Sequence, residues 1–138
     1  MKIILLVGAK NCGKTSTLNL VYAHLINYGY KCPNQIKPLN LSYNEPHDFE
    51  ADLLSPSKKN IKIASHGDTK GYCNTIYQNA MNTNCDILIM ACNNQNYNPN
   101  SAWYSNAIKI QKTVSQNQDK KIQFYSNLRD CEEIISNI

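Results

Sequence analysis

Apolar residues along this chain gather into short runs that end at glycine or at polar residues. Segments 2–7 and 87–92 are nearly continuous apolar runs, which is typical of strands buried on both faces of a parallel sheet. Apolar and acidic residues alternate over 49–53, as in a half-exposed strand. A polar turn at 55–60 separates it from a further apolar stretch at 61–65, so these two segments predict an antiparallel hairpin.

Helical spacing predicts the elements between and after these strands. Residues 14–28 place apolar side chains on one helical face, and Gly29 stands where it can end that helix. Residues 71–81 predict a second helix. A third helical face is predicted from apolar residues spaced three or four positions apart, namely Trp103, Ala107, Ile110 and Val114. Segment 122–125 predicts a last strand, followed by a short helix that carries Ile134, Ile135 and Ile138.

Strands that alternate with helices predict an α/β fold, here a three-layer α/β/α sandwich with a mainly parallel sheet and one antiparallel hairpin strand. Segment 30–47 contains three prolines and shows no clear period, which predicts a long loop. No internal repeat or linker interrupts the sequence, so residues 1–138 are predicted to form a single domain.

The composition narrows the class of protein without indicating a chemistry. A chain with 42% hydrophobic and 17% charged residues is ordinary for a globular protein. Its formal charge of +4 is too small to indicate a nucleic-acid partner. The first apolar run is too short for a secretory signal or a membrane span, so we expect a cytoplasmic protein without a membrane partner. The six cysteines form no C-x-x-C pair, and we expect reduced thiols rather than a zinc site.

The sequence Gly-Ala-Lys-Asn-Cys-Gly-Lys-Thr at 8–15 follows the pattern G-x-x-x-x-G-K-[ST], between a predicted strand and a predicted helix. Glycines let a backbone wrap around an anion, and the N–H groups of the loop and helix N-terminus bind phosphate oxygens. Lys14 is expected to reach the β- and γ-phosphates, and the Thr15 hydroxyl to complete a Mg²⁺ shell. The expected phosphate-binding residues are Gly8, Ala9, Lys10, Asn11, Cys12, Gly13, Lys14, Thr15 and Ser16.

On this motif the chain resembles the Walker A P-loop NTPases, and among them small single-domain ATP-binding proteins. The resemblance is specific over 2–16 and general over the rest of the chain. It implies a P-loop NTPase topology, with phosphates over the carboxyl ends of parallel strands and with Mg²⁺ and ATP as ligands. The MinD-like ATPases carry a lysine directly after the first glycine, where this chain has Ala9, so we do not assign that class.

A second landmark is the D-x-x-G pattern of GTPase-like proteins at 68–71. Asp68 follows a predicted strand, so the resemblance implies that it orients Mg²⁺ and acts in catalysis together with Lys14. Two other readings stay open: Asp68 caps a helix in a turn, or Ser65 occupies the strand-end position. Asp86 precedes its strand, and we predict a strand-edge or capping residue there.

Sequence patterns that would identify the nucleotide base and the reaction are weaker than the phosphate-binding motif. The guanine-reading motif N-K-x-D is replaced by Asn-Asn-Gln-Asn at 93–96, so we predict ATP rather than GTP. Ser126 and Asn127 follow the predicted last strand, where a base-contacting loop is expected. His66 borders the expected γ-phosphate site and either orients water there or is a structural histidine, the more common outcome.

A nucleotide kinase of this size would need several arginines around its acceptor phosphate, and Arg129 is the only arginine in the chain. The acidic residues between 45 and 52 could hold a general base for a hydroxyl acceptor, but we favour a solvated strand there.

The sequence thus predicts Mg²⁺-dependent ATP binding with slow hydrolysis of the β–γ bond, used as a switch. A small-molecule or nucleoside kinase is the first alternative. A GTPase-like switch, or a non-catalytic module gated by nucleotide for a protein partner, is the second. A protein partner or a homodimer is compatible with either switch.

Overall fold

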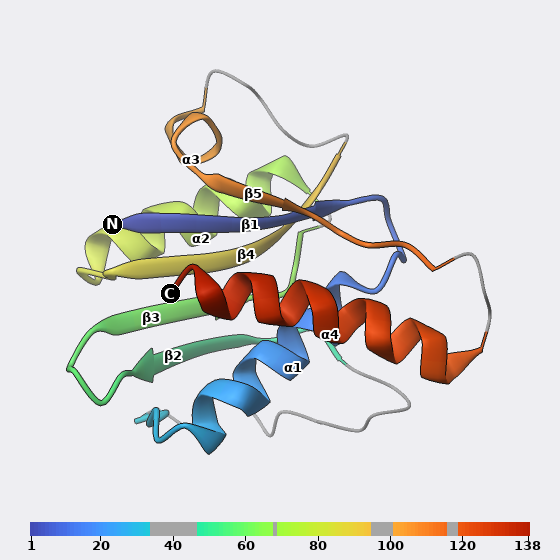
Figure 1. Cartoon of the computed structure of the whole chain (residues 1–138). Coiled ribbons are helices and arrows are strands. Elements are labelled where there is room, and N and C mark those ends of the chain that lie inside the picture. The colour runs from blue at the N-terminus through green and yellow to red at the C-terminus, as the bar shows by residue number, and fades with distance from the viewer. Residues whose placement is uncertain (34–46, 68, 95–100, 116–118) are drawn as a thin grey trace.

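The computed structural model describes residues 1–33, 47–67, 69–94, 101–115 and 119–138, which form a five-stranded sheet and four helices (Figure 1). The strands are β1 (Lys2–Gly8), β2 (Glu50–Leu54), β3 (Asn60–Ala64), β4 (Ile87–Asn93) and β5 (Ile108–Gln111). The helices are α1 (Lys14–Asn27), α2 (Lys70–Asn82), α3 (Ala102–Ser105) and α4 (Lys120–Ser136).

The sheet is mainly parallel, in the order β2-β3-β4-β1-β5. Strand β1 lies between β4 and β5 and is parallel to both, with Ile4 opposite Ile89 on one side and Ile108 on the other. The antiparallel pair is β2 with β3. The predicted α/β class, mainly parallel sheet and antiparallel hairpin are therefore confirmed.

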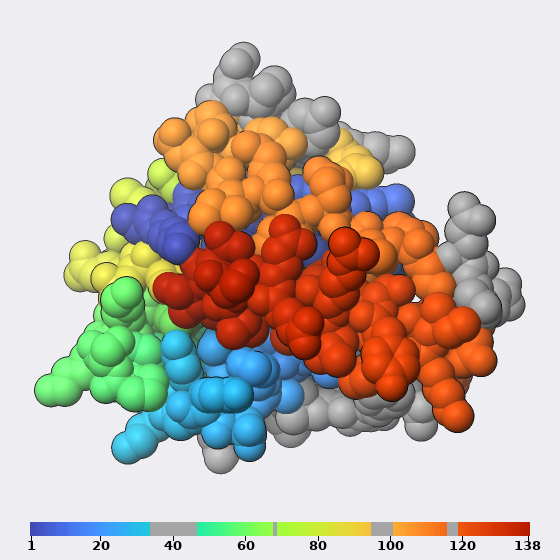
Figure 2. Space-filling view, viewed as in Figure 1, coloured from blue at the N-terminus to red at the C-terminus, as the bar shows by residue number. Residues whose placement is uncertain are grey.

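Alternate residues of β1 and β4 enter two separate cores, one on each face of the sheet. Ile4 and Leu6 pack in one core with apolar residues of α1 and α4. Leu5 and Val7 pack in the other core with residues of α2 and with Trp103 of α3. Burial on both faces explains why the β1 and β4 sequences are continuous apolar runs. In Figure 2, α4 lies across the front of the molecule above α1.

Two predicted elements are wrong. The helical face predicted through Trp103 and Val114 is interrupted, because α3 ends at Ser105 and Ile108–Gln111 form β5. Ile108 and Ile110 alternate with polar residues at the period of a strand. These residues pair with β1, so the segment is a strand although its apolar spacing also fits a helix. Trp103 is nevertheless buried, as predicted for a core residue.

The strand predicted at 122–125 is instead part of α4. Asp119 caps this helix by accepting a hydrogen bond from the Lys121 N–H at 2.8 Å. The helix is held in the fold by its later turns, where Cys131 and Ile134 are buried. Ile122 and Tyr125 are 43% and 68% exposed, so the apolar character of that segment reflects no burial in a sheet.

Most of the loop predicted at 30–47, and residues 95–100 of the segment after β4, lie outside the described residues. Asp68 lies outside them as well. In the part of the chain that the structure describes, none of the helices combines the length and apolar character that a membrane-spanning helix requires.

Candidate functional site

The loop between β1 and α1 lies at the carboxyl end of β1. Gly13 precedes α1 with a φ of 93°, a left-handed conformation that other residues adopt only at a cost. Gly8 ends β1 where a Cβ would lie 2.7 Å from the Cys12 sulfur and 2.9 Å from the Lys112 Cβ. The two glycines of the motif are thus required by backbone conformation and by close packing.

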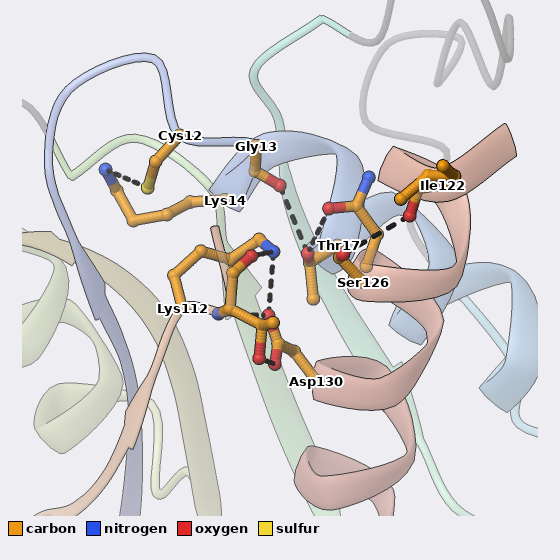
Figure 3. Close-up of polar contacts among 10 residues, drawn as sticks. Cys12, Gly13, Lys14, Thr17, Lys112, Ile122, Ser126 and Asp130 are labelled. Carbon is orange, nitrogen blue, oxygen red and sulfur yellow. Dashed lines mark hydrogen bonds and ion pairs between the residues drawn. The ribbon is translucent and has the colours of Figure 1, made fainter. Parts of the chain in front are cut away.

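The Lys14 side chain turns back over this loop. Its Nζ donates hydrogen bonds to the carbonyl oxygens of Ala9 at 2.6 Å and Gly8 at 3.2 Å. It also lies 3.9 Å from the Cys12 sulfur (Figure 3). Lys14 is only 7% exposed. The ammonium is therefore held inside the curve of the loop by backbone oxygens, and no acidic side chain lies in the first turn of α1.

A cavity of about 340 Å³ opens beside the loop. Its size is in the range of small-molecule sites. Six of the predicted phosphate-binding residues line it together with one acidic and one hydroxyl side chain: Asn11, Cys12, Gly13, Lys14, Thr15, Ser16, Asp48 and Ser65. Gly8, Ala9 and Lys10 are not among the lining residues, and Ala9 and Lys10 are exposed.

Asp48, just before β2, joins the loop to the end of β3. Its Oδ1 accepts hydrogen bonds from the Thr15 hydroxyl at 2.6 Å and the Ser65 hydroxyl at 3.1 Å. Its Oδ2 lies 3.3 Å from Nδ1 of His66. Asp48 is exposed to solvent, as favoured for this acidic segment, but it precedes β2 and also lines the cavity.

The two acidic residues within β2 make contacts within the hairpin and with α2, and they do not line the cavity. Asp52 and Glu50 lie 2.7 Å and 3.9 Å from the ammonium of Lys62, a buried residue of β3. Glu50 also accepts a hydrogen bond from the Tyr72 hydroxyl. Burial, and then this hydrogen bond, raise the pKa of the Tyr72 hydroxyl well above its usual range.

Three other predicted positions lie away from the cavity or contact it indirectly. Asp86 Oδ2 accepts a hydrogen bond from the Asn60 N–H at 2.7 Å, which agrees with the predicted strand-edge role. Ser126 and Asn127 lie within α4 and not in a loop. The Asn127 side chain still approaches α1, because its Oδ1 is 3.4 Å from the Thr17 hydroxyl.

A buried ion pair lies under the loop. The Lys112 Nζ and Asp130 Oδ2 are 2.7 Å apart, and the two side chains are 0% and 1% exposed (Figure 3). Asp130 also accepts hydrogen bonds from Thr113, through its N–H at 2.8 Å and its hydroxyl at 2.6 Å. The methylene groups of Lys112 lie against Gly8 and Gly13, so this pair supports the loop from below.

Comparison of the chain with family models, with curated proteins and with solved structures found no match. In the described residues there is no cluster of three or more His, Cys, Asp or Glu side chains that could hold a metal ion by themselves. The chemistry of the site therefore has to be argued from its own geometry.

Cys12 is expected to be the cysteine whose alkylation depends on nucleotide. It lines the cavity and is partly exposed, as is Cys32, which is not among the residues that line it. Burial raises the pKa of the Cys85 thiol, and raises that of Cys131 to about 11, so both should react slowly. Peptide mapping after brief iodoacetamide treatment should show Mg–ATP slowing Cys12 alone. Equal protection of Cys32, or none at Cys12, would contradict this expectation.

Proposed function

We propose that this chain binds Mg–ATP through residues 8–16 and slowly hydrolyses the β–γ phosphate bond, as a three-layer α/β protein of P-loop topology. The observation that supports this best is the cavity that residues 11–16 line, with the Lys14 ammonium held by the carbonyl oxygens of the same loop. A loop that presents N–H groups and a lysine at the start of a 14-residue helix favours an anionic ligand.

The position of the cavity in the sheet supports the same proposal independently of the motif. Strand β1 leads into α1 on one face, whereas the neighbouring strand β4 is followed by α3 on the other face. Adjacent parallel strands whose connections leave toward opposite faces open a crevice at their carboxyl ends, where α/β proteins bind ligands. The loop and its cavity lie at the carboxyl end of β1.

In this proposal the side chains of the site bind and orient the triphosphate. Lys14 exchanges its two carbonyl partners for β- and γ-phosphate oxygens, and the Thr15 hydroxyl faces the metal. Bound Mg²⁺ supplies neutralisation of the charge that develops on the phosphate oxygens. Hydrolysis is favoured over kinase chemistry because Arg129 is exposed on α4 and does not line the cavity.

The test is nucleotide binding followed by product analysis. ATP is expected to bind at least about tenfold more tightly than GTP, a difference of about 1.4 kcal/mol, because residues 93–96 lack the lysine and aspartate that read guanine. Thermal shifts with each nucleotide, with and without Mg²⁺, measure this preference. GTP binding tenfold more tightly would overturn the choice of base.

Product analysis separates the alternatives. Phosphate release from ATP without an acceptor supports hydrolysis. Formation of ADP only in the presence of a hydroxyl or phosphate acceptor would indicate a kinase. Binding without turnover would indicate a module that responds to nucleotide and passes the signal to a protein partner or a second copy of the chain.

A further inference from the structure

We propose that Asp48, together with Thr15, forms the protein side of the Mg²⁺ site. The sequence motif points instead to the strand-end residue Asp68. This assignment rests on the proposed nucleotide-binding function and adds to it the carboxylate that receives the metal. Asp48 is placed by the start of β2, and no local sequence pattern marks it.

Three oxygen atoms from three separate segments converge here. Asp48 Oδ1 lies 2.6 Å from the Thr15 hydroxyl oxygen at the start of α1. The same atom lies 3.1 Å from the Ser65 hydroxyl oxygen, directly after β3. All three residues line the cavity that the phosphate loop forms. A carboxylate and hydroxyls are hard oxygen donors of the kind that Mg²⁺ prefers.

The donor set also fits a metal that is shared with a nucleotide. Mg²⁺ in nucleotide sites keeps several waters and takes one or two carboxylates plus phosphate oxygens, so it needs no all-protein cage. A single carboxylate with two hydroxyls is therefore sufficient. The lack of a larger acidic cluster among the described residues agrees with such a site.

The charges in the cavity give an independent reason. Among the described residues that line the cavity, Asp48 is the one with an acidic side chain. In the proposed function, the loop on the other side of the cavity binds an anion. The Lys14 ammonium does not neutralise Asp48, because its hydrogen bonds go to Gly8, Ala9 and Cys12. A carboxylate next to a triphosphate would repel it, unless a cation lies between them.

Neighbouring contacts fix the Asp48 carboxylate in place. Its second oxygen, Oδ2, faces Nδ1 of His66 at 3.3 Å. The next residue, Phe49, is buried, and its N–H donates to the Ser65 hydroxyl at 2.8 Å. The Phe49 ring packs edge-on against Tyr22 of α1, with centroids 5.9 Å apart. Asp48 is thus oriented before any ligand arrives, as a metal-binding carboxylate should be.

The competing explanation is that Asp48 only ties α1 to the hairpin. Asp48→Asn separates the two roles, because the amide oxygen still accepts hydrogen bonds from Thr15 and Ser65 but carries no charge. We measure the dissociation constant of the non-hydrolysable β,γ-imido analogue of ATP in EDTA and in excess MgCl₂. For the wild type, Mg²⁺ should tighten binding at least about tenfold.

For Asp48→Asn the two buffers should give opposite results. In EDTA the variant should bind the analogue about twofold to fivefold more tightly than the wild type, because a repelling charge is gone. In MgCl₂ it should bind more weakly than the wild type, so that the tightening by Mg²⁺ falls to about twofold or less. If Asp48 only ties two segments together, Asp48→Asn keeps both hydrogen bonds, and Mg²⁺ would tighten binding by the same factor as in the wild type. That result would overturn the assignment.

Three variants complete the experiment. Thr15→Ala should also reduce the tightening by Mg²⁺ but should not improve binding in EDTA, because no charge is removed. Asp86→Asn, at an exposed site outside the cavity, should match the wild type in both buffers. If Asp68→Asn removes the Mg²⁺ effect while Asp48→Asn keeps it, Asp48 is not the metal carboxylate. If the wild type binds the analogue in neither buffer, the proposed function itself fails.

Discussion

Replacing Lys14 with alanine is expected to raise the dissociation constant of ATP at least about 100-fold, or roughly 2.8 kcal/mol. Lys14 is 7% exposed, and its ammonium is held by two loop carbonyls beside the cavity. A hydrogen bond to a charged group contributes about 1.5–3 kcal/mol, and in the proposed complex this ammonium makes two such bonds to phosphate oxygens. Titration of a fluorescent ATP analogue measures the change.

Lys10→Ala is the matched control, because it removes the same charge from an exposed side chain that does not line the cavity, and it leaves the backbone N–H groups of the loop in place. Its effect on ATP affinity should stay within about threefold, as expected for a solvent-screened charge. Thermal unfolding of both variants without nucleotide checks that the fold is kept. Equal loss of affinity in the two variants would mean that the site responds to overall charge, and wild-type affinity in Lys14→Ala would remove the basis of the proposed function.

The elements that the sequence predicted correctly are those whose pattern has one physical cause. Strands β1 and β4 are buried on both faces, so their apolar runs are continuous. Helix α1 has its apolar face on the core and ends before Gly29, which has a φ of 87°. The order of the strands was not predictable in this way. The place of β4 between β1 and β3 depends on how the connections cross the sheet, which no local pattern records.

The two wrong elements have different causes, and the first is a pattern that satisfies two periods at once. Ile110 fits the spacing of a helix with Trp103 and also the alternation of a strand with Ile108. Pairing with β1 decides in favour of the strand. Segment 122–125 is apolar but lies on an exposed part of α4, where apolar residues are not evidence of burial.

The sequence predicted the part of the candidate site that one local motif contains, and it missed the contact that depends on distant residues. The residues of the loop between β1 and α1 are neighbours in sequence, so one motif contains them. Asp48 reaches Thr15 across 33 positions, and only the hairpin brings it there. The observed register of the hairpin explains its position. Glu50 pairs with Ala64, so the residue two positions earlier lies beside Ser65 and His66, at the same end of the sheet as the loop between β1 and α1.

The buried pair under the loop gives the largest expected effect on stability. Asp130→Ala should lower the free energy of unfolding by about 3–5 kcal/mol, because it leaves the Lys112 ammonium buried without a counter-charge. The Thr113 N–H and hydroxyl lose their acceptors as well. Urea unfolding followed by circular dichroism measures the loss. Glu132→Ala, an exposed change of the same type on the same helix, should stay within about 0.5 kcal/mol of the wild type.

A double variant tests whether the unpaired charge is the cause. Replacing Lys112 with methionine and Asp130 with leucine removes both charges and keeps a similar volume, so most of the lost stability should return. The methylene groups of residue 112 would still lie against Gly8 and Gly13, as they do now. Recovery of stability in the double variant, with ATP affinity near that of the wild type, would show that the pair supports the loop by packing. If the double variant is as unstable as Asp130→Ala, the unpaired charge of Lys112 is not the cause of the lost stability. Asp130 then stabilises the fold mainly through its hydrogen bonds with Thr113.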